Sequence, residues 1–327
     1  MNMKRIQYYI VTLCMGMFLL TGCSRDSVED VEFDVRVKND LNNIRVGEPV
    51  TFLFDGNAEY ISFFSGENGN NYANITRDSV GVADLKIACT IKQQYTDKEY
   101  RMKEMVHVYL SQDFSGIYDL QNIQKANWTK ISGSEYNQIA VPLTETASTD
   151  EVSSIVDISD YKQKPFYVAF MYNAPKRVDV PASSGGGRYV VAPRVDVNPL
   201  SLTKTTVEGD IVVLDNPSTD WGFQVVYEKS TETSNYSVND GGLLFQPQQN
   251  KEHTDDDVIV WMVSRLIQPW EIEPDRGLPI KSLDAYLSSY SHIFQTPGEY
   301  TLTFIATNAT LWDSSRIVKH ITLTVKE

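Results

Sequence analysis

The feature that most constrains this chain is a series of short, largely apolar runs, several of which alternate between apolar and polar residues. Examples are residues 49–54, 105–110, 166–171, 221–227, 258–263 and 300–305. A period of two places every second side chain on one face, as in a half-buried β-strand. Gly, Pro, Asn and Asp separate the runs, and Tyr and Phe, which favour strands, fill them. Past the N-terminal region no amphipathic helix is evident beyond short turns, as near residues 283–289, so we predict an all-β fold of sandwiches or jelly rolls.

The first 22 residues have the organisation of a secretory signal. Lys4 and Arg5 precede an apolar stretch at residues 10–20, which is too short to span a bilayer. The stretch ends in Leu-Thr-Gly-Cys at residues 20–23, which resembles the lipobox of bacterial lipoproteins. This resemblance implies cleavage before Cys23 and attachment of lipid to its thiol. We therefore expect a signal peptide over residues 1–22 and a lipidated Cys23; an ordinary signal peptide followed by a chance cysteine is the alternative.

An acidic segment follows Cys23. Residues 23–32 carry four acids, and Ser24 replaces the aspartate that would resemble an inner-membrane retention signal. The segment resembles the surface-export signal of Bacteroidota lipoproteins, which implies an outer-membrane protein exposed on the cell surface. A solvated acidic linker is the alternative. We predict that the lipid anchor is the only membrane attachment.

Charge and composition narrow the functional classes. The chain has 327 residues, with 29 Lys+Arg against 43 Asp+Glu, and a formal net charge of −14. An acidic chain offers no cationic excess to replace counterions on phosphates, so nucleic acid is not an expected partner. A hydrophobic content of 42% and a charged content of 22% exclude a disordered chain and a multi-span membrane protein. With Cys23 lipidated, the expected mature protein has one unmodified cysteine, Cys89, in an alternating run at residues 83–91, where we expect a buried structural thiol.

The order of the runs predicts three modules after the tether. Residues 33–112 resemble the first half of an immunoglobulin-like repeat of the polycystic-kidney-disease type. Residues 113–270 resemble a galactose-binding-like jelly roll. Residues 271–327 resemble the last hairpin of a polycystic-kidney-disease repeat, with Pro297 and Gly298 at its turn. About 57 residues are marginal for an independent core, so the last module is expected to pack against a neighbour.

Four segments together resemble the domain-of-unknown-function family 5017 of Bacteroidota lipoproteins. These are residues 63–67, 113–116, 261–264 and 273–281. The family has no settled activity, but the resemblance implies an accessory surface lipoprotein of the kind found with glycan importers.

Catalytic motifs are missing from the sequence. The 4 His lie far apart, without the short spacing of a zinc site, and no nucleophile elbow is present. We therefore expect a protein that is not an enzyme and needs no cofactor. A paired-carboxylate glycosidase leaves no sequence signature, so a glycoside-processing enzyme remains an alternative. Asp255, Asp256 and Asp257 form the densest acidic run and are weak candidates for a structural Ca²⁺, although a solvated loop is the simpler interpretation.

Aromatic residues give the remaining indication of a ligand. Flat rings stack on the apolar C–H faces of sugars, while polar side chains bond the hydroxyl groups. Trp128, Trp221 and Trp312 lie beside polar residues or turns, and Arg188 lies in a Gly-rich loop, so these four are the candidate glycan-binding residues. Core packing is the simpler interpretation for each Trp taken singly, and Trp261, within an apolar run, is expected in the core.

These observations lead to one main functional hypothesis and one rival. The main hypothesis is a non-catalytic surface lipoprotein that binds glycan beside an outer-membrane importer and its substrate-capturing lipoprotein. The rival is a structural or adhesive lipoprotein that binds a protein partner.

Overall fold

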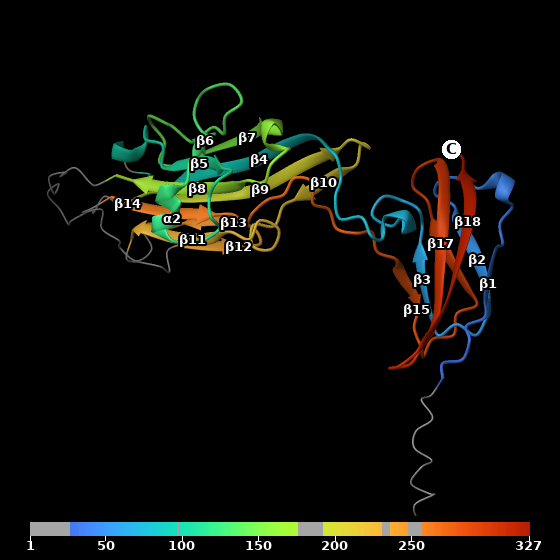
Figure 1. The fold of residues 1–327 in the computed structure, drawn as a ribbon. Helices are drawn as coiled ribbons and strands as arrows, with labels where there is room; N and C mark the ends of the chain where they lie inside the picture. The colour runs from blue at the N-terminus through green and yellow to red at the C-terminus, as the bar shows by residue number, and fades with distance from the viewer. Residues whose placement is uncertain (1–26, 97, 176–191, 231–235, 248–256) are drawn as a thin grey trace, which may run out of the picture. The chain divides into compact units, whose positions relative to one another are not determined.

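The computed structural model describes residues 27–96, 98–175, 192–230, 236–247 and 257–327. As predicted, the described chain is nearly all β, and it divides into two compact units (Figure 1). Unit 1 combines Met1–Asp78 with Glu273–Glu327, and unit 2 is the intervening Ser79–Ile272. The chain therefore leaves unit 1, forms unit 2 and then returns to complete unit 1.

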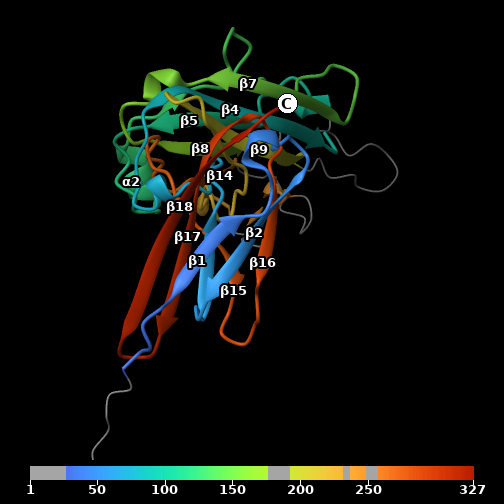
Figure 2. The same cartoon turned by 90° about the vertical axis from the view of Figure 1, so that its right-hand side faces the viewer.

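Unit 1 is a sandwich of two antiparallel sheets with strand orders β1-β2-β16 and β15-β3-β17-β18, the first of which is visible in Figure 2. Its strands are β1 (Phe33–Val37), β2 (Pro49–Gly56), β3 (Tyr60–Phe64), β15 (Leu278–Lys281), β16 (Ser289–Ile293), β17 (Gly298–Ala309) and β18 (Ser314–Val325). Two short 3₁₀ helices, η1 (Leu41–Asn43) and η2 (Tyr72–Asn74), lie in its connections.

Aromatic side chains fill the space between the two sheets of unit 1. Alternation along β2 buries Val50 and Phe52 toward the opposite sheet. The Phe52 ring centroid lies 5.8 Å from that of Phe63 and 5.1 Å from that of Phe304. Phe63 and Phe304 are themselves paired across β3 and β17. The period-two pattern of the sequence thus forms a continuous core from segments about 250 residues apart.

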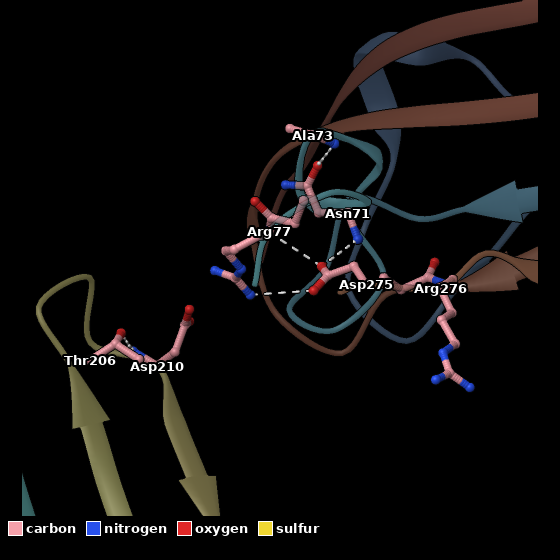
Figure 3. A network of polar contacts seen from close by, with 9 residues as sticks. Asn71, Ala73, Arg77, Thr206, Asp210, Asp275 and Arg276 are labelled. Carbon is pink, nitrogen blue, oxygen red and sulfur yellow. Dashed lines mark hydrogen bonds and ion pairs between the residues drawn. The ribbon is translucent and has the colours of Figure 1, made fainter. Parts of the chain in front are cut away.

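A buried carboxylate holds the chain where it leaves and rejoins unit 1 (Figure 3). Asp275 accepts hydrogen bonds from the Asn71 backbone N–H (2.8 Å) and the Asn74 side-chain amide (3.3 Å). It also pairs with Arg77 at 3.3 Å, and its own N–H donates to the Asn74 carbonyl. These contacts fasten the returning chain to the departing one; we call this set the Asp275 clamp.

Unit 2 is a larger sandwich. One sheet has the order β12-β13-β9-β4-β7 with β10 paired to β9, and the other has the order β11-β14-β8-β5-β6. The first sheet consists of β4 (Val82–Gln94), β7 (Asp150–Asp157), β9 (Arg194–Thr206), β10 (Ile211–Leu214), β12 (Tyr236–Asn239) and β13 (Gly242–Phe245). The second consists of β5 (Val106–Ser111), β6 (Thr129–Lys130), β8 (Tyr167–Ala174), β11 (Gln224–Lys229) and β14 (Val258–Val263). Helix α2 (Leu120–Lys125) and the 3₁₀ helices η3 (Lys98–Tyr100) and η4 (Ser159–Tyr161) lie in connections.

The alternating run around Cys89 forms β4, as predicted. Leu85, Ile87, Cys89 and Ile91 are all buried in the core between the two sheets. Burial raises the pKa of the Cys89 thiol to about 12. The thiolate is therefore scarce at neutral pH, and the residue is structural.

The structure corrects the predicted division into three modules, of which only the border near residue 270 lies at the limit of a unit. β4 and β5, expected in the module 33–112, belong to unit 2, so no border lies near residue 112. The tail 271–327 is not a module of its own, because β16 pairs with β2 and β17 pairs with β3. A hairpin of this length cannot bury a core alone, and it does so by completing the sandwich that the N-terminal strands begin.

Candidate functional site

The strongest candidate site lies on the outer face of the β11-β14-β8-β5-β6 sheet, away from the core of unit 2. Alternation in β5 turns Val106 and Val108 into the core and His107 and Tyr109 outward. Met171 of β8 lies between His107 of β5 and Trp261 of β14 in the pairing register. Strand pairing thus gathers outward side chains that are more than 150 residues apart.

The connection between β5 and β6 covers part of this face (Figure 1). Asp113 accepts hydrogen bonds from the backbone N–H (2.8 Å) and the side-chain amide (2.5 Å) of Asn127, which closes the connection. Between them, Phe114 packs edge-on against Tyr167, with ring centroids 4.9 Å apart at 87°. Asp119 caps α2 by accepting from the Asn122 N–H at 2.8 Å. We call residues 112–128 the cover segment.

Four rings remain together at the edge of the cover segment, and we call His107, Tyr109, Trp128 and Trp261 the aromatic platform. The Trp261 centroid lies 5.7 Å from that of Trp128, with an interplanar angle of 39°. It lies 5.6 Å from that of Tyr109, at 33°. The His107 and Tyr109 centroids are 6.3 Å apart. Trp261 is only 8% exposed and forms the base, while the other three rings are partly exposed.

Hydrogen bonds fix the two indoles of the platform. The Nε1–H of Trp128 donates to the Ile123 carbonyl at 2.9 Å, which ties the ring to α2. The Nε1–H of Trp261 donates to the Glu228 carboxylate, also at 2.9 Å. Glu228 is partly exposed and has a second carboxylate oxygen. The platform therefore has an acceptor at one border, beside a rigidly held ring.

A small cluster of titratable residues lies at the other border of the platform. Oε2 of Glu104 lies 2.5 Å from Nζ of Lys130 and 3.2 Å from Nδ1 of His107. Burial and Lys130 lower the pKa of His107, against an opposing contribution from Glu104. Burial, followed by the charge of Glu104, raises the pKa of Tyr109. At neutral pH the imidazole is mainly neutral and the phenol keeps its proton, so both can hydrogen-bond to uncharged hydroxyl groups.

The structure brings one of the predicted binding residues into this site. Trp128 belongs to the platform, whereas Trp312 lies in unit 1, on the turn between β17 and β18. The prediction for Trp221 is wrong: this ring is fully buried, stacks on Phe223 and donates to the Leu214 carbonyl. Arg188 and Cys23 lie outside the described residues.

His107 and Tyr109 were not among the predicted binding residues, and Trp261 was expected in the core. The runs that hold Trp261 and Met171 are apolar almost without interruption, and this signal points to a sheet covered on both faces. Where only part of the outer face is covered, aromatic side chains from such runs remain partly exposed to solvent.

The described part of the chain contains no cluster of three or more His, Cys, Asp or Glu that could hold a metal ion. Of the acidic run proposed for Ca²⁺, Asp255 and Asp256 lie outside the described residues, and Asp257 pairs with Lys229 at 3.1 Å. The Ca²⁺ prediction thus remains a prediction. Among the described residues, no helix has the length and apolar character needed to cross a bilayer.

A concave feature occurs in unit 1. A cavity of about 400 Å³ lies between the β2–β3 turn and the connection from β15 to β16. Its lining includes Asp55, Asn57, Lys281, Asp284 and Tyr286. Lys281 is already engaged, since its Nζ donates to the Glu59 carbonyl at 3.1 Å. The lining contains one ring pair, Phe33 and Phe54, with centroids 5.7 Å apart, and Phe33 is buried. The aromatic platform has three partly exposed rings, so it is the better ligand site.

Comparison with known proteins identifies a family. Residues 22–219 match the family described as Domain of unknown function (DUF5017), a stretch that includes the start of unit 1 and most of unit 2. No curated protein matches the chain. Because the match spans more than half of the 327 residues, the chain belongs to the DUF5017 family.

Proposed function

We propose that this protein is a non-catalytic, lipid-anchored surface protein that binds glycan on the aromatic platform of unit 2. The observation that carries this proposal is the cluster of partly exposed His107, Tyr109 and Trp128 rings over the Trp261 base. Ring faces offer stacking surface to the C–H groups of a pyranose. Glu104, Lys130 and Glu228 lie at the borders, where hydroxyl groups of a bound sugar could be hydrogen-bonded.

The proposal places the mature protein on the outer membrane through Cys23. The lipobox-like residues 20–23 and the acidic segment after them support a lipid anchor and outward exposure. A surface glycan binder fits an accessory role beside an outer-membrane importer and its substrate-capturing lipoprotein. Weak binding would suffice there, because many copies on one surface add avidity. Cys23→Ala should release the protein from the membrane fraction, and protease added to intact cells should cleave the wild type.

Binding is tested with the soluble protein of residues 24–327 on an array of plant, host and microbial glycans. Trp128→Ala and Lys130→Ala should each lower affinity for the best ligand about tenfold, the loss expected for one stacking or charge-assisted contact. Lys130→Ala removes an exposed side chain and should leave folding intact. Tyr136→Ala is the matched control, since this fully exposed ring of unit 2 lies outside the platform.

Three results would count against the glycan proposal. They are the absence of binding across the array, equal losses for Tyr136→Ala and Trp128→Ala, and unchanged affinity in both platform variants. A melting curve for each variant separates lost binding from lost folding.

The rival role, binding of a protein partner, has its own structural support. Val207, Ile211 and Val213 are exposed apolar side chains on or beside β10, a short strand outside the main strand order of its sheet. An apolar group on a strand at a sheet margin is typical of protein contacts. Ile211→Lys should abolish such an interaction and leave glycan binding unchanged.

The non-catalytic part of the proposal has a separate test. The soluble protein should release no reducing sugar from a broad polysaccharide panel. Reproducible turnover that is lost on changing one Asp or Glu would replace the binding proposal with a glycoside-processing enzyme.

A further inference from the structure

One end of unit 1 carries four exposed apolar side chains. Leu283 (54% exposed) and Tyr286 (92%) lie in the connection from β15 to β16, and Leu311 (92%) and Trp312 (78%) lie in the β17–β18 turn. Single exposed apolar residues are common, but four large ones on the turns of one sandwich end indicate a contact surface. We call these four residues the apolar tips.

Hydrogen bonds show that both turns lie at the same end. The Glu59 carbonyl accepts from Lys281 Nζ (3.1 Å), at the end of β15. The Glu59 N–H donates to the Asn308 side chain (2.8 Å), near the end of β17. Glu59, at the start of β3, therefore links the elements that precede each turn. Figures 1 and 2 both show the two turns at this end of unit 1.

The N-terminal segment reaches the fold at this same end. The Val31 N–H donates to Ser315 Oγ (3.0 Å), and the Glu29 carbonyl accepts from the Asn308 side-chain amide (3.2 Å). Cys23 precedes Glu29 by six residues, which span at most about 20 Å when fully extended. A lipid on Cys23 would therefore hold the apolar tips close to the bilayer surface.

We propose that the apolar tips insert into the interfacial region of the bilayer that carries the Cys23 lipid. This inference rests on the proposed lipid anchor, but its test supplies the tether chemically and is independent of lipidation in cells. Trp and Tyr prefer the water–hydrocarbon interface, where the ring is buried and its polar group stays hydrated. The contact would orient unit 1 with this end toward the membrane and the turn at Arg45–Glu48 away from it.

Charge at this end specifies which membrane surface fits. Glu29, Asp30, Asp284 and Asp313 are exposed acids near the apolar tips. They repel an anionic surface within about a Debye length, roughly 8–10 Å at physiological salt. A zwitterionic surface is therefore the matching partner, and negative lipid should weaken the contact at low salt.

The experiment uses the protein of residues 23–327, coupled through Cys23 to a maleimide lipid in phosphatidylcholine vesicles. Cys89 will not compete, because it is buried and its thiol pKa is raised to about 12. Lipids brominated near the headgroup should quench part of the tryptophan emission. That quenched part should be absent in Trp312→Phe and reduced in vesicles that contain anionic lipid.

A matched control moves the anchor to the other end of unit 1. Glu48 is exposed and directly precedes β2, whereas the apolar tips lie at the end where β2 finishes. The double variant Cys23→Ser, Glu48→Cys should couple equally well and show no quenching of Trp312. The inference is overturned if Trp312→Phe and wild type are quenched alike, or if both anchor positions give the same quenching. Failure of the lipoprotein proposal would instead appear as no release by Cys23→Ala in cells.

Discussion

Both units are sandwiches of antiparallel sheets, but they differ in how many faces of their sheets are covered. In unit 1, strands such as β16 and β18 alternate between more and less exposed residues, so each sheet has one core face and one solvated face. In unit 2, β8 and β14 are buried on nearly every residue. The cover segment explains this difference, since Phe114 and Ile123 pack on the outer face of their sheet.

This difference determines what each unit can present. A sheet with one solvated face needs polar outward residues, and the apolar side chains of unit 1 that are more than half exposed lie in the connections between its strands. A sheet covered on both faces keeps aromatic residues outward, and where the cover ends they remain partly reachable. A ligand surface on unit 2 and a membrane-facing end on unit 1 both follow from this contrast.

The largest expected effects test whether the two cores are independent. Phe304→Ala in unit 1 and Phe170→Ala in unit 2 each empty a fully buried site. Each should lower the free energy of unfolding of its own unit by about 4 kcal/mol. Hydrogen exchange read by mass spectrometry can follow the units separately. Equal loss of protection in both units for either variant would contradict two separate cores.

The next effect concerns the Asp275 clamp in unit 1. Asp275→Ala leaves Arg77 and the Asn71 N–H without their buried acceptor. Removing one partner of a buried pair should cost unit 1 about 3 kcal/mol. Glu273→Ala is the control, because its ion pair with Arg276 is solvent-exposed and should contribute under about 1 kcal/mol. Urea unfolding gives both values, and similar losses would contradict a special role for the clamp.

In unit 2 a buried cation holds the C-terminal end of the unit instead. Lys204 is 5% exposed, and its Nζ donates to the carbonyls of Pro269 and Glu271. Burial lowers the pKa of Lys204, with an opposing contribution from Glu271. Lys204→Met keeps the volume and removes the ammonium group with both of its hydrogen bonds, so the free energy of unfolding of unit 2 should fall by about 2 kcal/mol. Hydrogen exchange at residues 266–272 should rise, and unchanged protection there would contradict the prediction.

The sequence predicted the strands well and the grouping of strands poorly. Period-two runs around Phe52, Cys89 and Phe304 are local signals, and each became a strand with the expected face inward. The pairing of β3 with β17 is not local, because no spacing rule states that a chain will return to its first strands after about 200 residues. The predicted grouping into three modules was wrong for this reason.

The same limit applies to the platform. Trp128 was accessible to sequence reasoning because polar residues surround it, but its contact with Trp261 depends on strand pairing and on the closure of the cover segment. Trp221 has equally polar neighbours and is nevertheless buried, because its ring packs on Phe223. Local polarity therefore does not separate an exposed ring from a core ring.

The smallest expected effect is a pH dependence of the stability that the cover segment contributes to unit 2. Hydrogen bonds from the Asn127 side chain, the Asn127 N–H and the Ser111 hydroxyl lower the pKa of Asp113. A carboxyl group with a lower pKa in the folded state binds fewer protons there than in the unfolded state. Its stabilising contribution is therefore complete above the ordinary carboxyl pKa of about 4 and is lost as pH falls through the folded-state value.

Asp113→Asn should thus lower the urea midpoint of unit 2 slightly at pH 6, and the deficit should vanish toward pH 2. Asp240→Asn, on the exposed β12–β13 turn, changes the charge equally and should show no such convergence. If both variants gave parallel curves across this pH range, Asp113 would not be what holds the cover segment closed.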